Sequence, residues 1–157
     1  SNLMKALFGY LAVLGSAAFT GTMICIGFAF GGYWTSLAPE AFLSWFAANS
    51  GFIGRTIPVV AGPAAIGLLG SLWLARGHAP SRSAWFGAFG SMIGVALITG
   101  IYHLPTNAAF VSGTIPLDEV PATLTIWLQL HAARIALGAM ASGLALYGVI
   151  AAAHARK

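Results

Sequence analysis

Apolar residues dominate four stretches of this chain, and each stretch is long enough to cross a bilayer as a helix. The stretches cover approximately residues 6–30, 56–75, 84–103 and 122–152. A transmembrane helix needs about 20 consecutive, mostly apolar residues. Most ionisable side chains fall between or beyond these stretches. The pattern therefore predicts an all-α integral membrane protein, built as a bundle of four transmembrane helices.

The loop between the first two stretches carries a helical pattern of its own. Pro39 suits the first turn of a helix, and Glu40 suits the positive end of its dipole. Aromatic and amide side chains then recur at helical spacing, at Phe42, Trp45, Phe46 and Asn49. We expect a short interfacial helix that lies on the outer surface and covers the bundle. The loop 104–121 is expected to be mostly irregular, because proline and glycine interrupt it repeatedly.

Composition narrows the class of protein. Of the 157 residues, 59% are hydrophobic and 6% are charged, whereas about a quarter of a soluble domain is charged. The lysines and arginines lie mostly near segment ends, so we expect no nucleic-acid partner. A single cysteine excludes a disulfide scaffold. The length fits one four-helix domain, 4–157, in which Met4 is the expected start and Ser1, Asn2 and Leu3 are added residues.

The charged residues predict how the chain lies in the membrane. Lysines and arginines occur in the segment 76–82 and near both termini, at Lys5, Arg156 and Lys157. The acidic residues all lie toward the opposite end of the helices: Glu40, Asp118 and Glu119. Cytoplasmic segments carry the excess of Lys and Arg. We therefore expect both termini in the cytoplasm, with the bundle in a bacterial-type inner membrane.

Small residues recur four apart in the apolar stretches. The pairs are Gly27/Gly31, Gly67/Ser71, Gly90/Gly94 and Gly138/Ser142. This spacing allows close backbone contact between membrane helices. It also leaves surface for a homo-oligomer or for a place in a larger membrane complex. Pro58 and Pro63 predict a kink near the start of the second helix.

The most unusual polar residues lie inside the fourth stretch. Trp127, His131 and Arg134 are spaced i, i+4 and i+7, so one helix face carries all three. A guanidinium at the centre of a bilayer costs at least about 2.5 kcal/mol, and such a group normally faces a protein interior or a cavity. This face is therefore the predicted location of the function.

Counting along the helices, at about 1.5 Å per residue, places several polar side chains at one depth in the outer half. They are Glu40, Asn49, Arg55, His103, Asn107, His131 and Arg134. The prediction is an outward-facing pocket between the third and fourth helices, with Trp127, Trp45 and Phe46 as its aromatic lining. Tyr33 and Trp34 fit an aromatic belt at the membrane interface.

Two kinds of chemistry are open to the two histidines. His103 and His131 on facing helices could hold a metal ion or ligate a haem. Alternatively, one of them takes a proton while Arg134 and Asn107 stabilise a developing oxyanion. A closed zinc site lacks the cysteine or acidic ligands that it needs.

The run Tyr102-His103-Leu104-Pro105-Thr106-Asn107, followed after a loop by Trp127-x-x-x-His131-x-x-Arg134, resembles the DUF1772 or anthrone-oxygenase-like family. The resemblance implies a small four-helix membrane protein with its site within residues 102–134. For some members it also implies oxidation of anthrones in polyketide pathways. The enolate of an anthrone can reduce O2 directly, so this reaction strictly requires no cofactor.

We therefore expect an oxidoreductase-like membrane protein that acts on a flat hydrophobic small molecule. Its expected catalytic residues are His131, Arg134, His103 and Asn107. The predicted substrate pocket adds Trp127, Trp45, Phe46, Asn49, Glu40 and Arg55. The alternative is a non-catalytic protein that binds haem, a quinone or a lipid, or an accessory subunit of a membrane complex.

Overall fold

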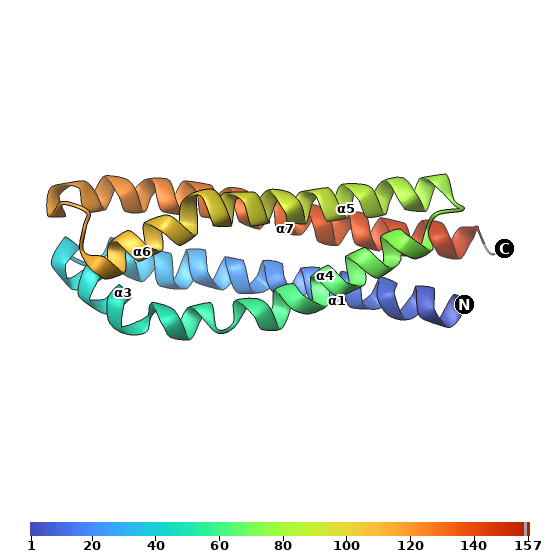
Figure 1. The fold of residues 1–157 in the computed structure, drawn as a ribbon, viewed down its shortest axis with the longest axis horizontal. Helices are drawn as coiled ribbons and strands as arrows, with labels where there is room; N and C mark the ends of the chain where they lie inside the picture. The colour runs from blue at the N-terminus through green and yellow to red at the C-terminus, as the bar shows by residue number, and fades with distance from the viewer. Residues whose placement is uncertain (156) are drawn as a thin grey trace.

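The computed structural model describes residues 1–155 and 157, and these form four long helical spans in an elongated, antiparallel bundle (Figure 1). The spans are Asn2–Thr35, Pro39–Leu74, Ala79–Ser112 and Leu117–His154, each long and apolar enough to cross a membrane. The predicted all-α, four-helix architecture is confirmed. Arg156, part of the predicted basic tail, lies outside the described residues.

The two ends of the bundle differ and are named here for later use. Both termini and the turn 75–78 lie at one end, the terminal end (Figure 1). The connections 36–38 and 113–116 lie at the opposite end, the loop end.

The first and third spans share one plan, in which a π-helical segment separates two α-helices. The first span comprises α1 (Asn2–Cys25), η1 (Ile26–Phe30) and α2 (Gly31–Thr35). The third span comprises α5 (Ala79–Ile98), η2 (Thr99–His103) and α6 (Leu104–Ser112). π-helical turns are rare and frequently occur at functional sites. Both segments lie toward the loop end, where the predicted site residues are.

The second span is broken once, between α3 (Pro39–Gly54) and α4 (Ile57–Leu74). Pro58 has no N–H for the carbonyl four residues earlier, which favours an interruption here, and the Thr56 hydroxyl donates to Ile53 O at 2.7 Å. The predicted kink corresponds to this break. α3 starts at Pro39 as predicted, but it continues for 16 residues and runs along the bundle (Figure 1). The predicted interfacial helix is therefore the loop-end part of the second span.

The connection after the third span is shorter than the sequence suggests. α6 is helical because Pro105 occupies its first turn, where no intrahelical N–H bond is needed. Gly113 ends α6 in the left-handed region, with φ 67°. The expectation of a mostly irregular segment 104–121 is thus wrong. Two elements complete the chain, η3 (Leu117–Glu119) and α7 (Val120–His154).

Glycines bring α1 and α4 into direct backbone contact. A Cβ on Gly15 would lie 2.5 Å from the backbone N of Ala64, and a Cβ on Gly67 would fall on the backbone of Ala12. The predicted close approach is therefore present at Gly67. Of the pair Gly90/Gly94, Gly90 has nothing within 4 Å of an added Cβ, whereas a Cβ on Gly94 would lie 3.0 Å from Leu137 Cδ1.

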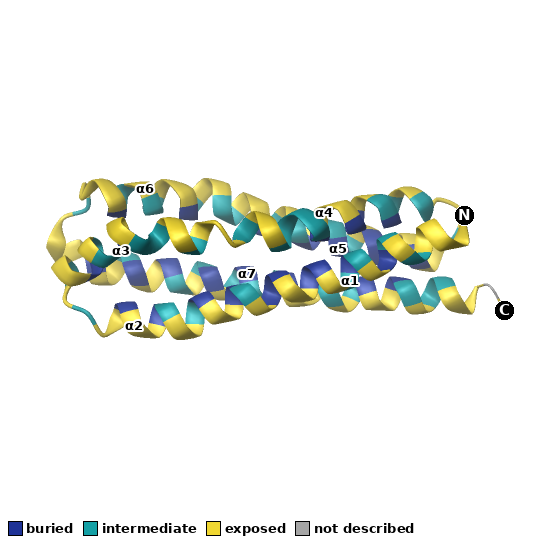
Figure 2. Ribbon diagram, turned by 90° about the horizontal axis from the view of Figure 1, so that it is seen from below, coloured by how far each residue is buried: buried dark blue, intermediate teal, exposed yellow. Residues whose placement is uncertain are grey.

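The buried residues face the inside of the bundle and the exposed ones face outward (Figure 2). Toward the loop end the interior contains Trp34, Phe42, Phe46, Phe110 and Trp127. On the outer surface large apolar side chains are exposed, including Leu14 (69%), Phe28 (78%), Val59 (71%) and Ile101 (77%). The bundle therefore presents apolar side chains on its outside as well as in its core.

Candidate functional site

The side chains of His131 and Arg134 are hydrogen-bonded, one turn apart on α7. Arg134 Nη2 donates to His131 Nδ1 at 2.7 Å, and both residues are buried. Guanidinium nitrogens act only as donors, so Nδ1 must accept. The contact therefore requires a neutral His131 ring with its proton on Nε2.

The second ring nitrogen of His131 ties α7 to α1. Its Nε2–H donates to the backbone O of Met23 at 2.7 Å. Gly27 in η1 makes room for the ring, since a Cβ there would lie 3.0 Å from His131 Cδ2. Both ring nitrogens are thus used in contacts with the protein, and neither is left for a substrate or a metal ion.

Arg134 has one donor without a partner. Its Nη1 donates to Thr99 Oγ1 at 3.0 Å, and Thr99 is the first residue of η2. Its Cζ lies 5.6 Å from the centroid of the Trp127 ring, within the range of a cation–π contact. Its Nε is buried and has no hydrogen-bond partner. The guanidinium is therefore fixed through Nη1 and Nη2, while its Nε–H has no partner.

His103 is oriented by the fourth span. Its Nε2–H donates to Trp127 O at 3.1 Å, because a carbonyl can only accept. Its ring packs edge-on against the Trp127 indole, with centroids 4.7 Å apart. Its Nδ1 is buried and has no hydrogen-bond partner. With the ring proton on Nε2, Nδ1 is the acceptor nitrogen of the neutral ring.

Trp127 lies at the centre of these contacts. Its Nε1 donates to Asn107 Oδ1 at 2.7 Å. Its indole stacks on the His131 ring, with centroids 5.1 Å apart and an interplanar angle of 19°. The four residues predicted to be catalytic, together with Trp127, thus form one connected cluster.

A cavity of about 330 Å³ adjoins this cluster. Its buried lining comes from all four spans: Phe19, Met23, Ile26, Trp34, Phe46, His103, Trp127 and Arg134. The rest of its lining is half-buried or exposed: Ser50, Ile53, Gly54, Ile57, Pro58, Thr99, Leu104 and Asn107. The second group comes from the α3/α4 break and from η2 and α6. The cavity therefore opens through the side of the bundle, between the second and third spans.

Three buried polar atoms of cavity-lining residues have no hydrogen-bond partner. They are His103 Nδ1, Arg134 Nε and Trp34 Nε1. The first is an acceptor and the other two are donors. Leaving such a group unpaired costs about 1–3 kcal/mol. A ligand with an acceptor oxygen and a hydroxyl group matches this set of atoms.

Trp34 is a site residue that sequence reasoning missed. The pattern predicts a place in an aromatic belt, whereas Trp34 is 2% exposed. Its indole meets the Trp127 ring edge-on, with centroids 5.4 Å apart. No local signal marks this position, because the direction of Trp34 depends on the preceding π-helical segment.

The predicted aromatic and amide lining is present in part. Phe46 and Trp127 line the cavity, but Trp45 and Asn49 do not. The half-buried Trp45 packs against neighbouring aromatic rings, including Tyr33 at a centroid distance of 5.7 Å. The Asn49 amide donates to Trp45 O at 3.0 Å within its own helix. Both side chains therefore belong to the packing around α3.

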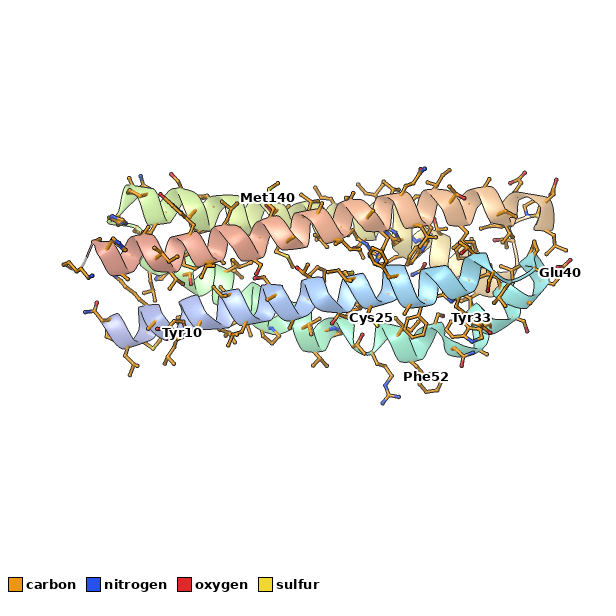
Figure 3. All side chains as sticks on the ribbon, turned by 180° about the vertical axis from the view of Figure 1, so that it is seen from behind. Tyr10, Cys25, Tyr33, Glu40, Phe52 and Met140 are labelled. Atoms are coloured by element: carbon orange, nitrogen blue, oxygen red, sulfur yellow. The ribbon has the colours of Figure 1, made fainter. Side chains whose placement is uncertain are left out.

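Glu40 and Arg55 lie outside the cavity as well, and both are exposed. Glu40 is in the first turn of α3 at the tip of the loop end (Figure 3). Arg55 follows α3, with its Cζ 6.0 Å from the centroid of the Phe52 ring. The prediction placed the two residues at one depth because it assumed a helix lying parallel to the membrane surface. α3 instead runs along the bundle and carries the two residues apart.

His131 does not line this cavity either. It lines a surface groove beside η1 and α2, together with Gly27, Gly31 and Gly32. Of the two histidines in the cluster, His103 is the one that presents a free ring nitrogen to the cavity. His131 holds Arg134 in place.

A metal ion or haem ligated by both histidines does not fit these contacts. The His103 and His131 ring centroids are 6.2 Å apart. Both nitrogens of His131 are already bonded, and its Nδ1 faces the Arg134 guanidinium. Across residues 1–155 and 157, no group of three or more His, Cys, Asp and Glu side chains is placed to hold a metal ion.

Comparisons with models of known protein families, with curated proteins and with solved structures gave no match. The resemblance to the anthrone-oxygenase-like family therefore rests on the quoted residues between Tyr102 and Arg134 and stays a prediction.

Proposed function

We propose that this chain is an integral membrane protein that oxidises a flat, oxygen-bearing apolar molecule bound in the cavity beside Arg134. Its apolar outer surface and its 6% content of charged residues support the membrane location. In hydrocarbon every backbone polar group needs a partner inside the protein. Helices supply those partners along each of the four spans.

α4 indicates the depth of the cavity in the bilayer. Its 18 residues extend about 27 Å at 1.5 Å per residue, close to the hydrocarbon thickness of about 30 Å. Arginines flank it, with Arg55 just before and Arg76 just after. The Arg76 side is the basic terminal end, which favours a cytoplasmic location in a bacterial-type inner membrane. The cavity mouth at the α3/α4 break then lies at the outer interface, where a molecule dissolved in lipid enters sideways.

The unpaired polar atoms define the ligand class. Arg134 Nε and Trp34 Nε1 require an acceptor oxygen, and His103 Nδ1 requires a proton donor. Most of the remaining buried wall is aromatic or aliphatic. The volume of about 330 Å³ falls at the lower end of the range of about 300–1,000 Å³ for small-molecule sites. These properties favour a compact aromatic ketone with hydroxyl groups.

An anthrone is the type of substrate that suits this arrangement. Its methylene group, opposite a ring carbonyl, loses a proton to His103 Nδ1. The enolate oxygen accepts hydrogen bonds from Arg134 and Trp34, and the Asn107 amide at the rim supplies a further donor. O2 then oxidises the enolate carbon. One oxygen atom becomes the new carbonyl, and the other leaves as water with the two methylene hydrogens.

One observation carries this proposal: a free acceptor on His103 and free donors on Arg134 and Trp34 belong to the lining of one cavity. The test is O2 uptake and quinone formation by the purified protein supplied with a hydroxyanthrone. We expect His103→Gln to lower the rate roughly 100- to 10,000-fold, the usual contribution of a general base. The matched control is His154→Gln at the exposed terminal end, which should react at the wild-type rate.

A His103→Gln variant as fast as the wild type would overturn the proton-transfer role. Quenching of tryptophan fluorescence by the anthrone provides a separate measure of binding, because Trp34 and Trp127 line the cavity. Quenching without O2 uptake in the wild type would instead assign the cavity to non-catalytic binding of a quinone or lipid.

A further inference from the structure

A second cavity, of about 350 Å³, lies at the terminal end of the bundle. Its lining includes Lys5 from α1, Ser71 from α4, Trp85 from α5 and Val149 from α7, so all four spans contribute. It shares no lining residue with the cavity beside Arg134. The proposed oxidation makes no use of it.

Three polar side chains in the lining of this second cavity, Lys5, Ser71 and His78, can donate hydrogen bonds. The Lys5 ammonium is a cation with three donors. His78 accepts the Ser81 backbone N–H at its Nδ1 (3.3 Å), so the proton of its neutral ring is on Nε2. Ser71 is 4% exposed, and its hydroxyl has no hydrogen-bond partner. A buried hydroxyl without a partner, in the same cavity lining as a cation and an imidazole N–H, indicates an anionic oxygen ligand.

The charge of the terminal end favours the same kind of ligand. The three acidic side chains of the sequence belong to α3 and η3 at the loop end. Arg76 lies in the turn 75–78, and Arg82 in the first turns of α5 donates from its Nη1 to Arg76 O at 3.2 Å. The Arg76 Cζ lies 4.3 Å from the centroid of the Trp73 ring. An anion approaching this end therefore meets cations and no side-chain carboxylate.

We propose that this cavity binds the phosphate group of an anionic phospholipid. Lys5, His78 and Ser71 donate to the phosphate oxygens, while Leu74, Trp85 and neighbouring alanines contact the carbons attached to them. Basic pockets between helices on the cytoplasmic side are a known type of site for acidic lipid headgroups. The inference rests on the proposed membrane location and is independent of the proposed oxidation.

The test compares the melting temperature of the detergent-purified protein with three additives: phosphatidylglycerol, phosphatidylcholine of the same chain length, and inorganic phosphate at constant ionic strength. A ligand that binds the folded state raises the melting temperature. We expect phosphatidylglycerol to raise it by several degrees more than phosphatidylcholine. If inorganic phosphate alone produces the same rise, the cavity is still a phosphate site, but its ligand is free phosphate from the aqueous phase and not a lipid.

Variants distinguish lipid binding in the cavity from attraction of the lipid to the basic surface of the terminal end. Lys5→Gln and Ser71→Ala should lose most of the phosphatidylglycerol effect, and Ser71→Ala should leave the lipid-free protein at least as stable as the wild type, since it removes an unpaired hydroxyl. Arg76→Gln removes one charge at the same end outside the lining and should keep most of the effect. No rise with phosphatidylglycerol or phosphate, or equal loss in Lys5→Gln and Arg76→Gln, would overturn the proposal. Anthrone oxidation, measured in parallel, should be unchanged in all three variants.

Discussion

Arg134 and His131 form a cation–imidazole pair in which the guanidinium donates to His131 Nδ1 over 2.7 Å. Buried cations usually pair with carboxylates, but here the partners are a neutral ring, the Thr99 hydroxyl and the face of Trp127. The positive charge is thus held without being neutralised. A guanidinium in this state favours an oxygen that becomes negative, such as that of an enolate.

Replacing His131 with alanine should destabilise the protein. The change removes the bonds to Met23 O and from Arg134 Nη2 and leaves a buried donor unpaired, so the free energy of unfolding should fall by about 1–3 kcal/mol. Thermal unfolding in detergent measures this loss. His154→Ala is the control and should change the stability by less than about 0.5 kcal/mol. If His131→Ala were as stable as the wild type, the proposed role of His131 in fixing Arg134 would be contradicted.

Replacing Trp34 with phenylalanine should weaken ligand binding, and it should also lower stability because phenylalanine does not fill the space of a buried indole. The variant keeps an aromatic ring but removes an Nε1–H that has no partner in the protein. We expect affinity for a hydroxyanthrone to fall about tenfold, equivalent to one hydrogen bond. Fluorescence titration gives the affinity. Trp45→Phe, outside the cavity lining, should bind as the wild type does, and equal losses in both variants would argue against a specific contact.

Replacing Thr99 with valine tests the contact between η2 and α7. Valine has nearly the same shape but no hydroxyl, so Arg134 Nη1 loses its acceptor. The free energy of unfolding should fall by about 1–2 kcal/mol. Thr99→Ser keeps the hydroxyl and should recover most of the difference. Equal melting temperatures for Thr99→Val and Thr99→Ser would show that the loss of stability does not come from the hydrogen bond of the hydroxyl.

Replacing Gly67 with alanine should disrupt the contact between α1 and α4. The added methyl group would fall on the backbone of Ala12, which cannot move as a flexible side chain can. Overpacking of this kind costs at least about 1–3 kcal/mol. Gly62 lies on the same helix with nothing within 4 Å of an added Cβ, so Gly62→Ala should be neutral or stabilising by up to about 1 kcal/mol. Similar melting temperatures for the two variants would contradict the close helix contact.

The apolar pattern located the four spans because each contains a long apolar run. It did not reveal that Pro105 lies in the first turn of a helix. Pro39 and Pro105 both occupy the first turn of a helix. Glu40 after Pro39 made a helix start recognisable. Pro105 lies two residues after the π-helical segment Thr99–His103, through which the helix continues, and the sequence offers no local sign of such a segment. The helical segment 104–112 was missed for this reason.

The cluster itself was predictable, whereas the cavity was not. Residue counts along helices place His103, Asn107, His131 and Arg134 at one depth, and the spacing of Trp127, His131 and Arg134 places these three on one face of α7. The direction of the cavity mouth depends on the α3/α4 break and on how the second and third spans pack. These are tertiary features, so a count of residues along one helix could not separate Phe46, which lines the cavity, from its neighbour Trp45.

The two π-helical segments have a consequence for insertions and deletions. A π-turn holds about one residue more than an α-turn, and each residue turns an α-helix by about 100°. Deleting one residue from Ile26–Phe30 would therefore convert the π-turn into an α-turn and keep the direction of Trp34, and a deletion in Thr99–His103 would do the same for Asn107. The contacts between α1 and α4 near the terminal end would keep their register. In this bundle each π-segment can therefore absorb the loss of one residue, whereas the same deletion in the α-helical part just before it would turn the site residues away from their partners on α7.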